Sequence, residues 1–229
     1  MGVGKSILFS KRIIKKKTSK SKTNLVTLPT ILRVELVFFY KLHILLTNFK
    51  LRHICGFSIK KVMKSNRNIV FLGMMGSGKT SIGFLISKKL KLDFYDVDHY
   101  IENKLKMKIS NIFKNKGEKF FREYEEKITL ELMKNRGIVM SLGGGAFLNK
   151  NIRNEVLKNH ISFWLKTKDD ILVQRIKKSA KRPLAYNVSN SDLQNMIKSR
   201  NKYYAKAQNE IDCNDKTKKE IVDKILDIL

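Results

Sequence analysis

The chain of 229 residues carries 48 Lys and Arg against 20 Asp and Glu, so its formal net charge is +28. Its two cysteines, Cys55 and Cys213, fit neither a disulfide framework nor a Cys/His metal motif, which favours a reducing, cytoplasmic location. The apolar stretch at residues 31–46 is interrupted by charged side chains and is too short to cross a bilayer, so no membrane partner is expected.

The positive charge is concentrated near the N-terminus, where residues 1–67 hold 16 Lys and Arg and a single acid, Glu35. We therefore expect residues 1–62 to form a basic extension and residues 63–229 to form the folded domain. Three interpretations of the extension stay open. It is a start assigned too early, with Met63 as the alternative, or a cleaved targeting segment, or a disordered arm for acidic partners such as nucleic acid.

From residue 68 onward, short apolar runs alternate with longer stretches of helical spacing. The pattern predicts, in chain order, a strand at 69–72, a helix at 80–90, a strand at 92–98, helices to about 135, and strands at 138–142, 161–165 and, weakly, 210–213. Strands that alternate with helices form parallel sheets through right-handed crossovers. The expected fold is an α/β three-layer sandwich around a five-stranded parallel sheet.

Residues 73–80 read GMMGSGKT, which satisfies the phosphate-loop pattern G-x-x-x-x-G-K-[ST] between a predicted strand and a predicted helix. Glycines let backbone amides surround phosphate oxygens at a helix N-terminus. Lys79 is expected to reach the β- and γ-phosphates, and the hydroxyl of Thr80 to bind Mg²⁺. The predicted nucleotide-binding residues of this loop are Gly76, Ser77, Gly78, Lys79, Thr80 and Ser81.

Two acids, Asp96 and Asp98, end the predicted second strand, at the edge of the sheet where ligands bind in open α/β folds. Residues two apart on a strand point to the same side, so both carboxylates are expected to face the phosphate loop. One carboxylate can then hold Mg²⁺ while the other accepts a proton from an acceptor hydroxyl. Two solvated acids at a strand end are the alternative.

Arg122 and Arg200 lie on separate helical stretches, and a glycine triplet, Gly143, Gly144 and Gly145, directly follows the third strand. Guanidinium groups bind planar carboxylates through two parallel hydrogen bonds. Glycines allow backbone to approach a ligand closely. In so basic a chain, solvated arginines and an ordinary flexible loop remain the alternatives.

A basic segment after the fourth strand contains Arg175 and Arg182. In a phosphoryl-transfer enzyme such a segment can act as a mobile lid that brings a cation onto the γ-phosphate. A solvated helix end is the alternative.

Together these motifs resemble the shikimate kinase family over residues 68 to about 225. They are the phosphate loop, Asp96-Val97-Asp98, the G-E-x-x-F-R-x-x-E segment from Gly117 to Glu125, the glycine triplet, Arg182-Pro183-Leu184, and Arg200 ahead of Tyr203-Tyr204. The resemblance implies a P-loop kinase with a mobile lid. Its expected reaction is ATP-dependent phosphorylation of the 3-hydroxyl of shikimate, a step of aromatic amino acid biosynthesis.

The resemblance also implies a role for each matching residue. Lys79, Asp98 and Arg182 are expected to be catalytic, with Asp98 as base or orienter of the 3-hydroxyl. Arg175 and Arg182 are expected to contact ATP, and Thr80 and Asp96 to serve Mg²⁺. The expected shikimate-binding residues are Asp98, Arg122, Gly143, Gly144, Gly145 and Arg200, with Glu125 orienting Arg122. A monomer without a nucleic-acid partner is expected.

Three other functions remain open from the sequence. Another small-metabolite kinase, such as a gluconate-type kinase, shares the phosphate loop and the size. A nucleic-acid-binding protein agrees with the net charge, although no interleaved aromatic and basic pattern appears. A degenerate kinase-like regulator is the third, although the charged residues that the chemistry needs are present.

Overall fold

A five-stranded parallel sheet with strand order β2-β3-β1-β4-β5 forms the centre of the fold. The computed structural model describes residues 66–178 and 188–229. The strands are β1 (Ile69–Leu72), β2 (Phe94–Asp96), β3 (Val139–Ser141), β4 (Ile161–Lys166) and β5 (Asn209–Asp212). The predicted parallel sheet is thereby confirmed, with each strand within a few residues of its predicted position.

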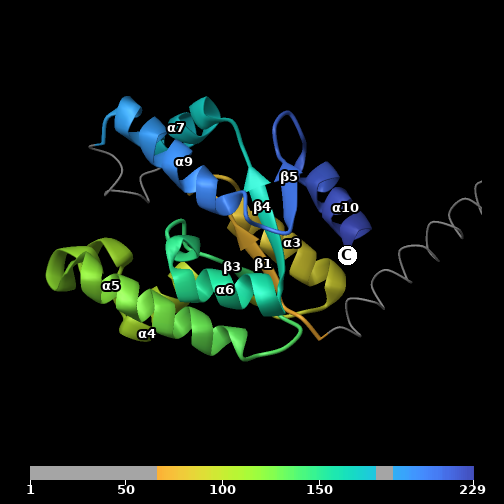
Figure 1. Ribbon diagram of the computed structural model, residues 1–229, viewed down its shortest axis with the longest axis horizontal. Helices are drawn as coiled ribbons and strands as arrows, with labels where there is room; N and C mark the ends of the chain where they lie inside the picture. The colour runs from red at the N-terminus through yellow and green to blue at the C-terminus, as the bar shows by residue number, and fades with distance from the viewer. Residues whose placement is uncertain (1–65, 179–187) are drawn as a thin grey trace, which may run out of the picture. The chain divides into compact units, whose positions relative to one another are not determined.

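Helices cover both faces of this sheet, so the fold has three layers (Figure 1). Because side chains alternate along a strand, Ile69 and Phe71 of β1 pack on one face while Val70 and Leu72 pack on the other. The first face is covered by α3 (Lys79–Leu90) and α10 (Lys218–Ile228). The second is covered by α4 (Val97–Leu105), α5 (Ile109–Met133), α6 (Lys150–Asn159), α7 (Asp169–Lys177) and α9 (Asn190–Tyr204).

The predicted second strand is too long at its C-terminal end. Strand β2 ends at Asp96, and Asp98 lies in the first turn of α4. The side chain of Asp96 accepts a hydrogen bond from the backbone N–H of His99, so Asp96 is the N-cap that ends the strand and begins the helix. The strand-alternation argument for Asp98 is therefore wrong.

Helix α5 is interrupted at Gly117, whose φ of 81° and ψ of 167° are not helical. Arg122 lies in the helical segment that follows this break, which agrees with its predicted place on a helix. A one-turn 3-10 helix, η1 (Ala146–Leu148), follows the glycine triplet and was not predicted.

Two predictions, the basic extension at residues 1–62 and the lid residue Arg182, lie outside the described residues. Within the two described ranges, no helix is both long enough and apolar enough to cross a membrane.

Candidate active site

The phosphate loop connects β1 to α3, as predicted. Three of its glycines have positive φ angles, namely 136° at Gly73, 87° at Gly76 and 94° at Gly78, which glycine adopts at little cost. The buried Lys79 folds back over the loop, and its Nζ donates to the carbonyl oxygens of Gly73 at 2.9 Å and Met74 at 3.0 Å. An ammonium held inside the loop is placed to meet the phosphates that the loop surrounds.

Thr80 and Asp96 meet beside the loop, where the Thr80 hydroxyl donates to Oδ2 of Asp96 at 2.6 Å. Thr80 lies in the first turn of α3 and Asp96 ends β2, so two neighbouring elements position this pair. A hydroxyl and a carboxylate are the hard oxygen ligands that Mg²⁺ takes in phosphate sites. The donor set therefore fits the predicted magnesium position.

Asp98 and Glu125 converge on Gly143. A Cβ atom at Gly143 would lie 2.6 Å from Oδ1 of Asp98 and 2.5 Å from Oε1 of Glu125, so only glycine lets both carboxylates approach the backbone here. Burial, reinforced by the negative charges of Glu125 and Asp96, raises the pKa of Asp98 to about 7, although Lys79 and Arg122 act to lower it. The pKa of the Asp98 carboxyl group is therefore suited to proton transfer near neutral pH.

Arg122 is held by two carboxylates and two aromatic rings. Its Nη1 donates to Oε2 of Glu125 at 2.7 Å and its Nε to Oε1 of Glu118 at 3.2 Å. The guanidinium carbon lies 5.1 Å from the ring centroid of Phe121 and 5.8 Å from that of Phe113. These contacts fix the plane of the guanidinium before any ligand binds.

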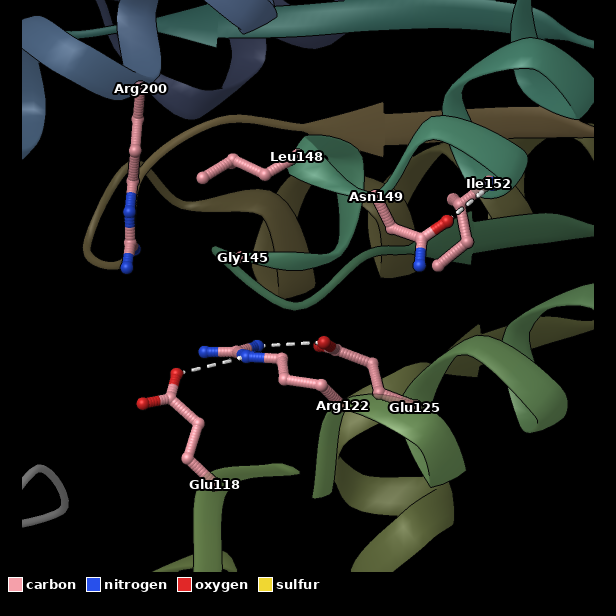
Figure 2. Close-up of a pocket in the computed structure, with 8 residues that line it drawn as sticks. All are labelled: Glu118, Arg122, Glu125, Gly145, Leu148, Asn149, Ile152 and Arg200. Atoms are coloured by element: carbon pink, nitrogen blue, oxygen red, sulfur yellow. Dashed lines mark hydrogen bonds and ion pairs between the residues drawn. The ribbon is translucent and has the colours of Figure 1, made fainter. Parts of the chain in front are cut away.

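Arg200 extends from α9 toward Arg122 from the opposite side of a cavity, as Figure 2 shows. Its Nη1 lies 3.4 Å from the carbonyl oxygen of Gly144 and 3.7 Å from Sδ of Met74. The cavity has a volume of about 340 Å³ and is lined by Glu118, Arg122, Glu125, Gly145, Leu148, Asn149, Ile152 and Arg200. The structure thus brings together two arginines that lie 78 positions apart in the sequence.

The glycine triplet forms the backbone between these arginines. A Cβ atom at Gly145 would lie 2.6 Å from Nη1 of Arg122, and one at Gly144 would lie 3.5 Å from Nη1 of Arg200. The hydroxyl of Tyr204 donates to the carbonyl oxygen of Gly144. The absence of side chains at the triplet keeps the space beside both guanidinium groups open.

Arg175 reaches the phosphate loop from α7, and its Nη1 donates to the carbonyl oxygen of Gly76 at 3.2 Å. Arg175 is otherwise exposed, and this hydrogen bond connects it to the loop. The nearby α3 residue Ser81 is exposed on the first turn of its helix.

Several residues at the site have no role assigned from the sequence, although Glu118 and Tyr204 stand within the quoted motifs. Glu118 precedes Arg122 by four positions, a spacing that predicts an ion pair on one helix face, and Tyr204 follows Arg200 by the same spacing. Helical spacing could therefore have identified both. Leu148, Asn149 and Ile152 carry no motif, because they line the cavity only through the 3-10 turn that η1 introduces.

Comparisons with known proteins agree with this geometry. The family model described as shikimate kinase matches residues 75–229. A shikimate kinase of Bartonella henselae is 44% identical over 160 residues, which cover 68% of this chain and 76% of the relative. A shikimate kinase of Buchnera aphidicola is 37% identical over 172 residues, which cover 73% of this chain and 98% of the relative.

Solved structures give the same result. A shikimate kinase from Acinetobacter baumannii in complex with shikimate superimposes with a TM-score of 0.67 at 32% identity, covering 71% of this chain and 92% of that chain. A shikimate kinase from Aquifex aeolicus gives a TM-score of 0.63 at 31% identity, covering 69% of this chain and 94% of that chain. The described fold, the phosphate loop and the matched residues lead to one conclusion: the chain belongs to the shikimate kinase family and is an enzyme of the shikimate pathway.

Proposed function

We propose that this chain transfers the γ-phosphoryl group of ATP to the 3-hydroxyl of shikimate by the residues described above. The observation that carries the proposal is the pair of arginines, Arg122 and Arg200, that face each other across one cavity. Asp98 approaches Gly143 beside Glu125, which lines this cavity, and the charge of Lys79 in the phosphate loop acts on its carboxyl group.

Arg122 and Arg200 hold the carboxylate of shikimate. Glu118 and Glu125 already bond Nε and Nη1 of Arg122, and they fix the orientation of its guanidinium. The described hydrogen bonds of Arg200 go to uncharged acceptors, which leave its positive charge available to an anionic substrate. The backbone of Gly143, Gly144 and Gly145 contacts the ring hydroxyls, because no side chain intervenes there.

The phosphate loop holds ATP through Gly76, Ser77, Gly78, Lys79, Thr80 and Ser81. Arg175, which reaches Gly76, adds a positive charge next to the phosphates. Arg182, outside the described residues, is proposed as the lid cation. Thr80 and Asp96 would hold Mg²⁺, which supplies charge neutralisation on the phosphates when it is bound.

Asp98 accepts the proton of the 3-hydroxyl as that oxygen attacks the γ-phosphorus. A base with a pKa of about 7 is partly ionised at neutral pH and still strong enough to take the proton. Lys79, released from the carbonyls of Gly73 and Met74, stabilises the charge on the phosphoryl group during transfer.

Three further features are proposed with the function. The match to residues 75–229 supports a kinase domain at 63–229, with residues 1–62 as an extension outside it. The free thiol of Cys213 supports a cytoplasmic location. A monomer without a nucleic-acid partner follows from the family resemblance, and light scattering of the purified chain tests it.

The experiment is ADP release by the full chain with Mg-ATP and one of three acceptors: shikimate, gluconate or CMP. Turnover that depends on shikimate alone is expected, because only shikimate combines a carboxylate with ring hydroxyls at this spacing. Turnover with gluconate or CMP but not with shikimate would contradict the proposed roles of Arg122 and Arg200.

A further inference from the structure

One wall of the cavity between Arg122 and Arg200 consists of the single-turn helix η1 and the first turn of α6. Gly145, Leu148, Asn149 and Ile152 belong to this wall. A 3-10 helix of three residues has little stability of its own, because its hydrogen bonds are few and poorly aligned. Its position must therefore be fixed by side chains from neighbouring elements.

Arg153 of α6 supplies such a side chain. Its Nη1 donates to two successive carbonyl oxygens at the end of η1, that of Phe147 at 3.1 Å and that of Leu148 at 2.9 Å. A cation at the carbonyl end of a helix is favourable because those oxygens carry partial negative charge. Arg153 does not line the cavity itself.

The same guanidinium also contacts α9. Its central carbon lies 5.2 Å from the centroid of the Tyr203 ring, in a cation–π arrangement. Tyr203 is three residues after Arg200, and its neighbour Tyr204 donates to the carbonyl of Gly144. Arg153 therefore links η1, which carries one wall of the cavity, to the helix that carries Arg200.

We propose that Arg153 and Tyr203 are a positioning pair that sets where Arg200 stands relative to the wall around Gly145, and thereby the affinity for the substrate carboxylate. The inference rests on the proposed function of the cavity. The pair requires an arginine, because one planar guanidinium must both donate to η1 and stack on the ring. The hydroxyl of Tyr203 has no part in it.

The test uses four variants of the full chain, with KM for shikimate, KM for ATP, kcat and the melting temperature measured for each. Arg153→Lys keeps the charge and is expected to raise the shikimate KM about tenfold, with the ATP KM changed less than about twofold. Tyr203→Leu is expected to raise the shikimate KM about fivefold. Tyr203→Phe, which keeps the ring, is expected to restore values close to those of the unmodified chain.

Lys206→Ala is the matched control. Its Nζ lies 5.7 Å from the centroid of the same ring, but Lys206 has no described bond to η1, so both KM values should stay unchanged. The proposal is overturned if Arg153→Lys and Tyr203→Leu leave the shikimate KM unchanged, if they raise both KM values equally, or if Tyr203→Phe behaves like Tyr203→Leu.

Two possible failures, misfolding of a variant and loss of the proposed function, can be told apart from failure of the positioning pair. If Arg153→Lys does not fold, the comparison of Tyr203→Leu with Tyr203→Phe decides, because Tyr203 is 37% exposed and its replacement should not prevent folding. Failure of the proposed function is separate, since it shows as an absence of shikimate turnover in the unmodified chain. If the unmodified chain phosphorylates shikimate but the variants leave the shikimate KM unchanged, only the proposal of a positioning pair is overturned.

Discussion

Arg122 and Glu125, one helical turn apart on α5, are joined by a 2.7 Å hydrogen bond from Nη1 to Oε2. The carboxylate is almost fully buried, and burial raises its pKa while Arg122 acts to lower it. Its other oxygen, Oε1, approaches Gly143 beside Asp98. One acid therefore orients a substrate-facing guanidinium and also acts on the proposed catalytic base.

Glu125→Gln should separate these two effects. Loss of the charge weakens the hold on Arg122, so the shikimate KM is expected to rise about tenfold. Because Glu125 is one of the charges that raise the pKa of Asp98, the acidic limb of the kcat profile should move to lower pH. Rates measured between pH 5 and 9 check both. If the acidic limb of the kcat profile does not shift in Glu125→Gln, the charge of Glu125 does not raise the pKa of Asp98.

Asp98→Asn should lower activity and raise stability. Loss of the base is expected to reduce kcat about 100-fold or more. The folded-state pKa of about 7 exceeds the usual 3.8, so the native carboxyl resists ionisation and the fold loses stability as pH rises between these values. The melting temperature of Asp98→Asn should therefore exceed that of the unmodified chain most at pH 8 and least at pH 4.

Asp93→Asn is the control for that comparison, since Asp93 is an exposed acid just before β2, five residues ahead of Asp98. Its difference in melting temperature from the unmodified chain should not follow this pH dependence. A stability difference for Asp98→Asn that stays constant from pH 4 to pH 8 would show that folding does not raise the pKa of Asp98.

Gly145→Ala tests how closely Arg122 approaches the backbone. The φ of −100° at Gly145 is open to any residue, so the substitution strains no backbone and acts only through the added methyl group. That group would lie 2.6 Å from Nη1 of Arg122 and must displace the guanidinium. We expect the shikimate KM to rise about tenfold or more with the ATP KM unchanged. Gly144→Ala, with its nearest contact at 3.4 Å, should have the smaller effect.

Arg175→Ala should affect the nucleotide alone. Its guanidinium contacts the carbonyl of Gly76 in the phosphate loop, so its loss is expected to raise the ATP KM about fivefold and to leave the shikimate KM unchanged. Lys178→Ala removes the same charge at the end of the same helix, where Lys178 is exposed, and should change neither value. Equal effects of the two substitutions would mean that only net charge matters.

The sequence predicts most accurately those parts of the site whose residues are contiguous in the chain. The phosphate loop is encoded within eight successive residues, and the apolar runs around it were enough to predict five parallel strands. The N-cap role of Asp96 was missed, because an acid at a strand end and an acid that begins a helix look alike in sequence. Asp98 was therefore placed near the phosphate loop for the wrong geometric reason.

The cavity wall could not be predicted, for a different reason. Leu148 and Ile152 are ordinary apolar residues, and only the turn of η1 brings them to the same cavity as Arg122. Arg153 likewise resembles any basic residue on a helix in this chain. Its two bonds to η1 depend on the 3-10 turn, which brings the carbonyl oxygens of Phe147 and Leu148 to α6 and which periodicity does not report.

The most direct measurement compares kcat/KM for shikimate and for its methyl ester, in the unmodified chain and in Arg200→Met. If Arg122 and Arg200 hold the carboxylate, the ester should react about 100-fold more slowly in the unmodified chain, because its carbonyl carries no charge. In Arg200→Met the penalty should shrink to about tenfold, since only Arg122 still discriminates. An ester penalty of the same size in both chains would contradict the placement of the carboxylate between these two arginines.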